Sequence, residues 1–71
     1  MKKTEIHTEY ITLSQFLKLC GAAMSGGEAK ELIVNGEVKV NGETDTRRGA
    51  KLRGGETVSV GGEEYEVARC S

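Results

Sequence analysis

The segment Gly36-Glu37-Val38-Lys39-Val40-Asn41-Gly42 is the part of this chain that is most informative about its fold. Gly36 accepts the left-handed backbone that closes a helix, so a helix is predicted to end there. Val38 and Val40 alternate with charged residues, which is typical of a half-buried strand. Asn41-Gly42 is the dipeptide that best tolerates positive φ at both centres of a tight hairpin turn. The stretch therefore predicts a helix that passes directly into a β-hairpin.

One strand and two short helices are predicted before this stretch. Residues 4–10 alternate with period two, which predicts a strand with one polar face. Thr12 and Gln15 have the spacing of a capping box at the start of a first helix, and Ser25 and Glu28 repeat it at the start of a second. Both helices are short, so packing on each other and on a sheet must stabilise them.

Glycine pairs divide the C-terminal half into short strands. Gly54-Gly55 marks a turn, and Gly61-Gly62 offers a two-residue hairpin between a strand over residues 57–60 and a last strand. The predicted order is β, α, α and then three or four short strands. We therefore expect a single α+β domain over residues 1–71. Its predicted core consists of the apolar positions at helical or strand period: Leu13, Phe16, Leu17, Leu32, Ile33, Val38, Val40 and Val58.

Length and composition exclude several classes of protein. The chain has 71 residues, near the size at which one apolar core only just supports folding. No segment approaches the ~20 apolar residues of a membrane span. Cys20 and Cys70 form no CxxC pair, and Cys20 falls on an apolar helix face, which favours free thiols over a disulfide. We therefore expect a cytoplasmic protein without membrane association.

Residues suited to catalysis or metal binding are not clustered. His7 is the one histidine, and it is expected on the surface of an edge strand. Glu63 and Glu64 are adjacent on a predicted strand, so they point to opposite faces and form no convergent acid–base pair. No cluster has the spacing of metal ligands. We expect no catalytic residues, no metal and no cofactor.

Charge is unevenly distributed along the chain, although its formal net value is −1. The basic segment, residues 39–53, contains two acids and five cations: Lys39, Arg47, Arg48, Lys51 and Arg53. Such a run is either a solvated turn or a contact for phosphates, and its position directly after a strand favours phosphates. The segment lacks aromatic residues, and Tyr10 and Tyr65 are predicted in strands. Recognition of a folded RNA by backbone and shape is therefore favoured over base stacking.

The start of the second helix is another candidate contact for phosphate. In Ser25-Gly26-Gly27, two residues without side chains lie where free N–H groups point out of a helix end, which carries a partial positive charge. The alternative is that the glycines only loosen the loop after Met24. Lys30, one turn further on, can reach the same side of the helix and favours the anion site.

These segments together resemble a known family. The succession of Leu13 to Leu19, Ser25 to Ile33 and Gly36 to Gly42 resembles the S4 RNA-binding domain. The continuation from Glu43 to Leu52 is similar to the small stand-alone bacterial YaaA/YbcJ-like members. The resemblance covers about residues 10–67. It implies an α-L fold, in which two helices pack on a small, curved, antiparallel or mixed sheet and bind RNA along the helix pair and the adjoining loop.

The resemblance also implies which residues bind RNA. They are Lys18, Ser25, Gly26, Gly27, Lys30 and Lys39, and the stand-alone members add Arg47, Arg48 and Lys51. The chain departs from the family at Thr12, Ser14 and Gly26, where many members carry charged residues. These changes remove charge, so we expect RNA affinity to depend more heavily on the basic segment.

The favoured function is a non-catalytic, monomeric module that binds structured RNA, either ribosomal or transfer RNA, alone or at the ribosome. The alternative is a protein-interaction adaptor with the same fold, which the net charge of −1 and the missing arginines would allow. A sulfur carrier of the β-grasp type is disfavoured, because such carriers need a C-terminal Gly-Gly and the glycine pairs here are internal. A salt titration separates the first two functions, because phosphate binding weakens steeply with ionic strength.

Overall fold

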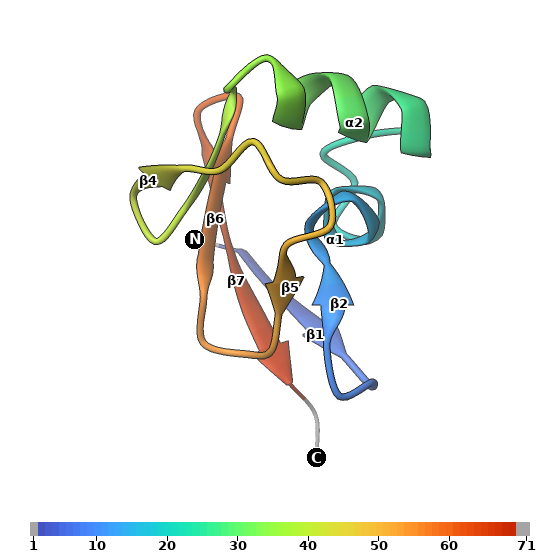
Figure 1. The fold of residues 1–71 in the computed structure, drawn as a ribbon. Helices are drawn as coiled ribbons and strands as arrows, with labels where there is room; N and C mark the ends of the chain where they lie inside the picture. The colour runs from blue at the N-terminus through green and yellow to red at the C-terminus, as the bar shows by residue number, and fades with distance from the viewer. Residues whose placement is uncertain (1, 70–71) are drawn as a thin grey trace.

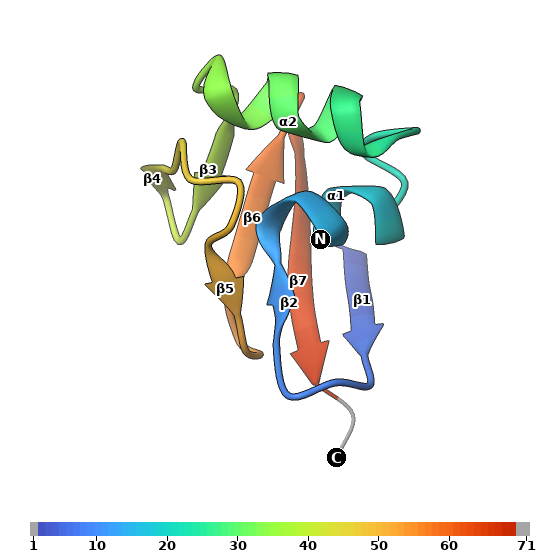
Figure 2. The same ribbon diagram turned by 45° about the vertical axis from the view of Figure 1, so that its right-hand side comes forward.

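A computed structural model describes residues 2–69, which form two helices, a five-stranded sheet and a two-stranded ribbon (Figure 1). The elements are β1 (Lys2–Ile6), β2 (Ile11–Thr12), α1 (Leu13–Leu19), α2 (Gly26–Val34), β3 (Val38–Val40), β4 (Glu43–Thr44), β5 (Lys51–Leu52), β6 (Thr57–Val60) and β7 (Glu63–Arg69). Both helices and the β2–β5 ribbon lie on the same side of the larger sheet (Figure 2). The predicted α+β class, with two short helices on a mixed sheet, is therefore confirmed.

The larger sheet places the first and the last strand of the described chain side by side. Its strand order is β1-β7-β6-β3-β4. β1 pairs with β7 in parallel, from Lys2 opposite Tyr65 to Ile6 opposite Arg69, and the remaining pairs are antiparallel. The parallel pair makes the sheet mixed and ties the first strand to the last.

The stretch from Gly36 to Gly42 adopts the predicted conformation. Gly36 has φ +76°, its N–H donates to the Ile33 carbonyl at 3.1 Å, and the Glu37 N–H donates to the Leu32 carbonyl at 3.0 Å. These two bonds form a Schellman motif, which satisfies carbonyls that a helix end otherwise leaves unpaired. Asn41 and Gly42 have φ +53° and +84°, the turn that matches the twist of the β3–β4 hairpin.

Both helices begin at the predicted caps. Thr12 accepts a hydrogen bond from the Gln15 N–H, and the Gln15 side chain accepts one from the Thr12 N–H, which completes the capping box. At α2, Ser25 Oγ accepts from the Glu28 N–H at 3.2 Å. A cap of this kind stabilises a short helix by about 1 kcal/mol.

The core lies between the helices and the sheet, and the predicted set is confirmed in large part. Leu32 and Val40 are only half-buried, which corrects their assignment to the core. Six residues outside the predicted set also fill the core: Ile6, Ala23, Ala29, Leu52, Val60 and Val67. Tyr65 is also buried, with 7% of its surface exposed, so its predicted place in a strand is confirmed.

The region from residue 7 to residue 10 corrects the predicted first strand. β1 ends at Ile6, and the Thr8 hydroxyl donates to the Tyr10 carbonyl at 2.7 Å, which turns the chain away from the sheet. His7 and Tyr10 therefore lie outside any strand. The number of strands after the helices is also larger than predicted, because the basic segment itself contributes β4 and β5.

Of the two cysteines, the structure describes Cys20 alone. Cys20 has a free thiol, and burial raises its pKa above the ordinary value of 9.0. Cys70 lies outside the described residues.

Neither helix of the described part is long and apolar enough to cross a membrane.

Candidate nucleic-acid interface

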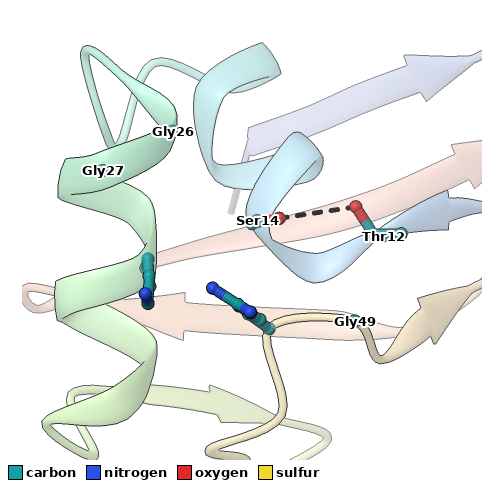
Figure 3. A pocket seen from close by; sticks show the side chains of 7 residues that line it. Thr12, Ser14, Gly26, Gly27 and Gly49 are labelled. Carbon is teal, nitrogen blue, oxygen red and sulfur yellow. Dashed lines mark hydrogen bonds between the residues drawn. The ribbon is translucent and has the colours of Figure 1, made fainter.

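A groove of about 490 Å³ lies between the starts of the two helices and the loop that precedes β5. Figure 3 shows Gly26 and Gly27 on one side of it, and Thr12, Ser14 and Gly49 on the other. Its lining consists of Thr12, Ser14, Gly26, Gly27, Lys30, Arg48 and Gly49. Segments that are distant in the sequence thus bring two cations, two hydroxyls and a helix start to one concave surface.

The loop before β5 is held in the groove by the backbone of α1. The Leu13 N–H donates to the Ala50 carbonyl at 2.8 Å, and the Ser14 N–H donates to the Arg48 carbonyl at 3.3 Å. Since the first N–H groups of a helix have no partner within the helix, these bonds satisfy the start of α1. They also fix Arg48 beside the groove, so one set of contacts stabilises the fold and positions a cation.

The start of α2 differs, because its first N–H groups remain available. Within residues 2–69, no acceptor bonds the N–H of Gly26 or Gly27, while Ser25 caps the N–H of Glu28. A Cβ added at Gly26 would meet no atom within 4 Å, so an anion can approach the backbone closely. Lys30 lies one turn further along the same side of α2, whereas Glu28 points away from it. Two unpaired N–H groups and Lys30 therefore lie together at the start of α2, an arrangement that suits an anion.

Arg47 does not line this groove. Its Nε and Nη2 donate to the Asp45 carboxylate at 3.1 and 3.0 Å, and its backbone N–H donates to Asp45 Oδ1 at 2.9 Å. The arginine hydrogen bonds lower the pKa of the Asp45 carboxyl below its ordinary value of 3.8, so the pair is ionised at neutral pH. The Arg47 side chain is 78% exposed but is already paired with an acid. The two adjacent arginines thus differ, because Arg47 is paired with Asp45 and Arg48 lines the groove.

Lys51 and Arg53 lie close to the aromatic ring of Tyr10, a residue that was predicted in a strand. The Lys51 Nζ lies 4.9 Å from the centroid of the Tyr10 ring, and the Arg53 Cζ lies 6.0 Å from it. Tyr10 is 41% exposed. The expectation that Tyr10 is committed to a strand is therefore wrong, and the basic segment does have an aromatic neighbour.

The remaining predicted cations lie on opposite sides of the molecule. Lys18 follows Ser14 by one turn on the same side of α1, although it does not line the groove. Lys39 alternates with the buried Val38, so it lies on the face of the sheet that the helices do not cover. Glu64 and Glu66 share that face, because they alternate with the buried Tyr65 and Val67. Lys39 therefore lies on the opposite face of the sheet from the groove.

Metal ligands do not gather in the described part of the chain. Among residues 2–69, no three His, Cys, Asp or Glu side chains lie close enough to hold a metal ion. The groove offers cations, hydroxyls and N–H groups, which are ligands for an anion.

Comparisons with known proteins agree with this arrangement. The sequence pattern of the S4 domain matches residues 4–68. A Bacillus subtilis (strain 168) protein named "Probable ribosome maturation protein RlbA" is 53% identical over 57 residues, which cover 80% of each chain. YbcJ of Escherichia coli (strain K12) is 41% identical over 58 residues, which cover 82% of this chain and 83% of YbcJ.

Solved structures agree as well. The solution structure of YbcJ from Escherichia coli, described as having an α-L motif involved in RNA binding, superposes with a TM-score of 0.74 at 36% identity, covering 96% of this chain and 87% of YbcJ. The ribosomal protein S4e of Thermoplasma acidophilum superposes with a TM-score of 0.63 at 25% identity, covering 83% of this chain and 31% of S4e. On its sequence and its fold, this chain belongs to the S4 domain family.

Proposed function

We propose that this protein is a non-catalytic RNA-binding protein that recognises structured RNA through the groove between α1, α2 and the loop before β5. The observation that carries the proposal is the convergence of Lys30, Arg48 and the free N–H groups of Gly26 and Gly27. Phosphate oxygens are strong acceptors for all of these donors. The names of the relatives support the same conclusion, since one is called a ribosome maturation protein and the other is described with an RNA-binding motif.

Ribosomal RNA is the partner that we propose first, with transfer RNA as the comparison. We further propose that the chain acts in the cytoplasm as one monomeric S4 domain. The test is a titration of the purified protein with ribosomal RNA and with transfer RNA at several salt concentrations. We expect the logarithm of the binding constant to fall linearly with the logarithm of the salt concentration. The expected slope is about 0.7 to 0.9 for each phosphate contact. Absence of binding at low salt would favour the adaptor function instead.

A first prediction concerns Gly26, where the added Cβ meets open space. Gly26→Arg is expected to strengthen binding to ribosomal RNA and to steepen the salt slope by about 0.7 to 0.9 unit, because it adds a cation at the edge of the groove. Gly26→Ala is the matched control, since it raises helix propensity without adding charge. Equal affinities of the two variants would show that no phosphate lies within reach of this helix start.

A second prediction concerns Asp45, which holds the guanidinium of Arg47. Asp45→Asn is expected to strengthen RNA binding roughly two- to fivefold, because it removes the ion pair and leaves the exposed Arg47 guanidinium available to a phosphate. Asparagine keeps an oxygen that can accept from the Arg47 N–H, so the turn is retained. Binding is measured at two salt concentrations. An unchanged affinity and salt slope would place Arg47 outside the RNA contact.

A further inference from the structure

Tyr10 combines exposure with two neighbouring cations. Its backbone precedes β2, where Ile11 pairs with Leu52 and Thr12 pairs with Lys51. Continuing this antiparallel register brings Tyr10 opposite Arg53. Leu52 is buried, with 2% of its surface exposed, so Lys51 and Arg53 point to the other face of the ribbon. The two cations and the ring thus form a cluster on the outer face of the β2–β5 ribbon.

This cluster continues the groove. Thr12 lines the groove and lies two residues from Tyr10 on the same face of the ribbon, a separation of about 7 Å along a strand. Arg48 and Lys51 are likewise connected by a short segment whose backbone is bonded to α1. A nucleic acid whose phosphates occupy the groove can therefore extend over the Tyr10 ring.

We propose that Tyr10, flanked by Lys51 and Arg53, is a stacking site for an unpaired base of the bound RNA. The inference rests on the proposed function and specifies its substrate as a structured RNA with an unpaired nucleotide beside the segment held in the groove. An aromatic ring accepts any base by its π-face. Lys51 and Arg53 now lie over the Tyr10 ring, so a base that stacks on this face takes their place, and the two displaced cations hold the adjoining phosphates. Tyr65 offers no such site, because its ring is buried in the core.

The test compares Tyr10→Leu with Tyr10→Phe in binding to purified ribosomal RNA over a range of salt concentrations. Tyr10→Leu is expected to weaken binding about 5- to 100-fold, because stacking on one ring is lost. Its salt slope should equal that of the unaltered protein, since tyrosine carries no charge. Tyr10→Phe keeps the ring and is expected to bind within about twofold of the unaltered protein. Thermal melting checks that both variants are folded.

Ultraviolet crosslinking to the same RNA, followed by mass spectrometry, is the second measurement. A nucleotide adduct is expected on Tyr10 and not on Tyr65. Unchanged affinity of Tyr10→Leu, or a loss of affinity with an equally reduced salt slope, would overturn the stacking site. The proposed function would still stand in that case if variants of Lys30 and Arg48 lose binding. Failure of the unaltered protein to bind ribosomal RNA at low salt would overturn both the stacking site and the proposed function.

Discussion

Lys30→Glu combined with Arg48→Glu is expected to weaken binding to ribosomal RNA by about 100-fold or more at moderate salt. The two side chains line the same groove from different elements, α2 and the loop before β5. A hydrogen bond to a charged group contributes about 1.5–3 kcal/mol, and charge reversal adds repulsion to the loss of each contact. The salt slope should fall by about 0.7 to 0.9 unit for each phosphate that is released.

The matched control is Lys3→Glu combined with Lys39→Glu, which changes the net charge by the same amount. Both lysines are exposed on the face of the sheet away from the helices. This control is expected to retain most of the affinity. Both double variants should remain folded by circular dichroism, because surface changes usually alter stability by less than about 0.5 kcal/mol. If both double variants lost the same affinity for ribosomal RNA, binding would depend on net charge, and the groove would not be the contact.

Phe16→Ala is expected to have the largest effect on stability. Phe16 has no exposed surface and lies in the core among residues of both helices and the sheet. Truncation of such a phenylalanine typically destabilises a protein by about 3–5 kcal/mol, and a domain of this size has a total stability of roughly 4–11 kcal/mol. The melting temperature should therefore fall by at least about 12 °C, or the variant should be unfolded at 25 °C.

Leu19→Ala is the control for Phe16→Ala, because both residues lie on α1 and Leu19 is 53% exposed. Its melting temperature should lie within a few degrees of that of the unaltered protein. Thermal unfolding followed by circular dichroism measures both variants. A Phe16→Ala protein that melts close to the Leu19→Ala protein would contradict the burial of Phe16.

Local features of the chain were predictable because their causes lie within a few residues. The helix end at Gly36, the hairpin at Asn41-Gly42 and the cap at Thr12 depend on backbone conformations that only certain side chains favour. The resemblance to the S4 domain added the arrangement of these elements, which the comparisons confirmed. Residues 7–10 were wrongly predicted because alternation alone does not reveal the hydrogen bond from Thr8 that turns the chain.

The candidate site was predictable only as a set of residue types. From the sequence it was predictable that cations follow the hairpin and that glycines open the second helix. It did not determine that Arg48 lines the groove while Arg47 pairs with Asp45, or that Lys39 lies on the other face of the sheet.

These differences arise from contacts between segments that are distant in the chain. Backbone bonds from Leu13 and Ser14 fix the loop before β5 against α1, and the pairing of β2 with β5 brings Tyr10 to Lys51 and Arg53. Contacts between segments far apart in the chain depend on how the core packs, and a local pattern carries no information about that packing. The sequence therefore determined which elements form and which charges are available. The fold alone determined which of those charges face a common ligand.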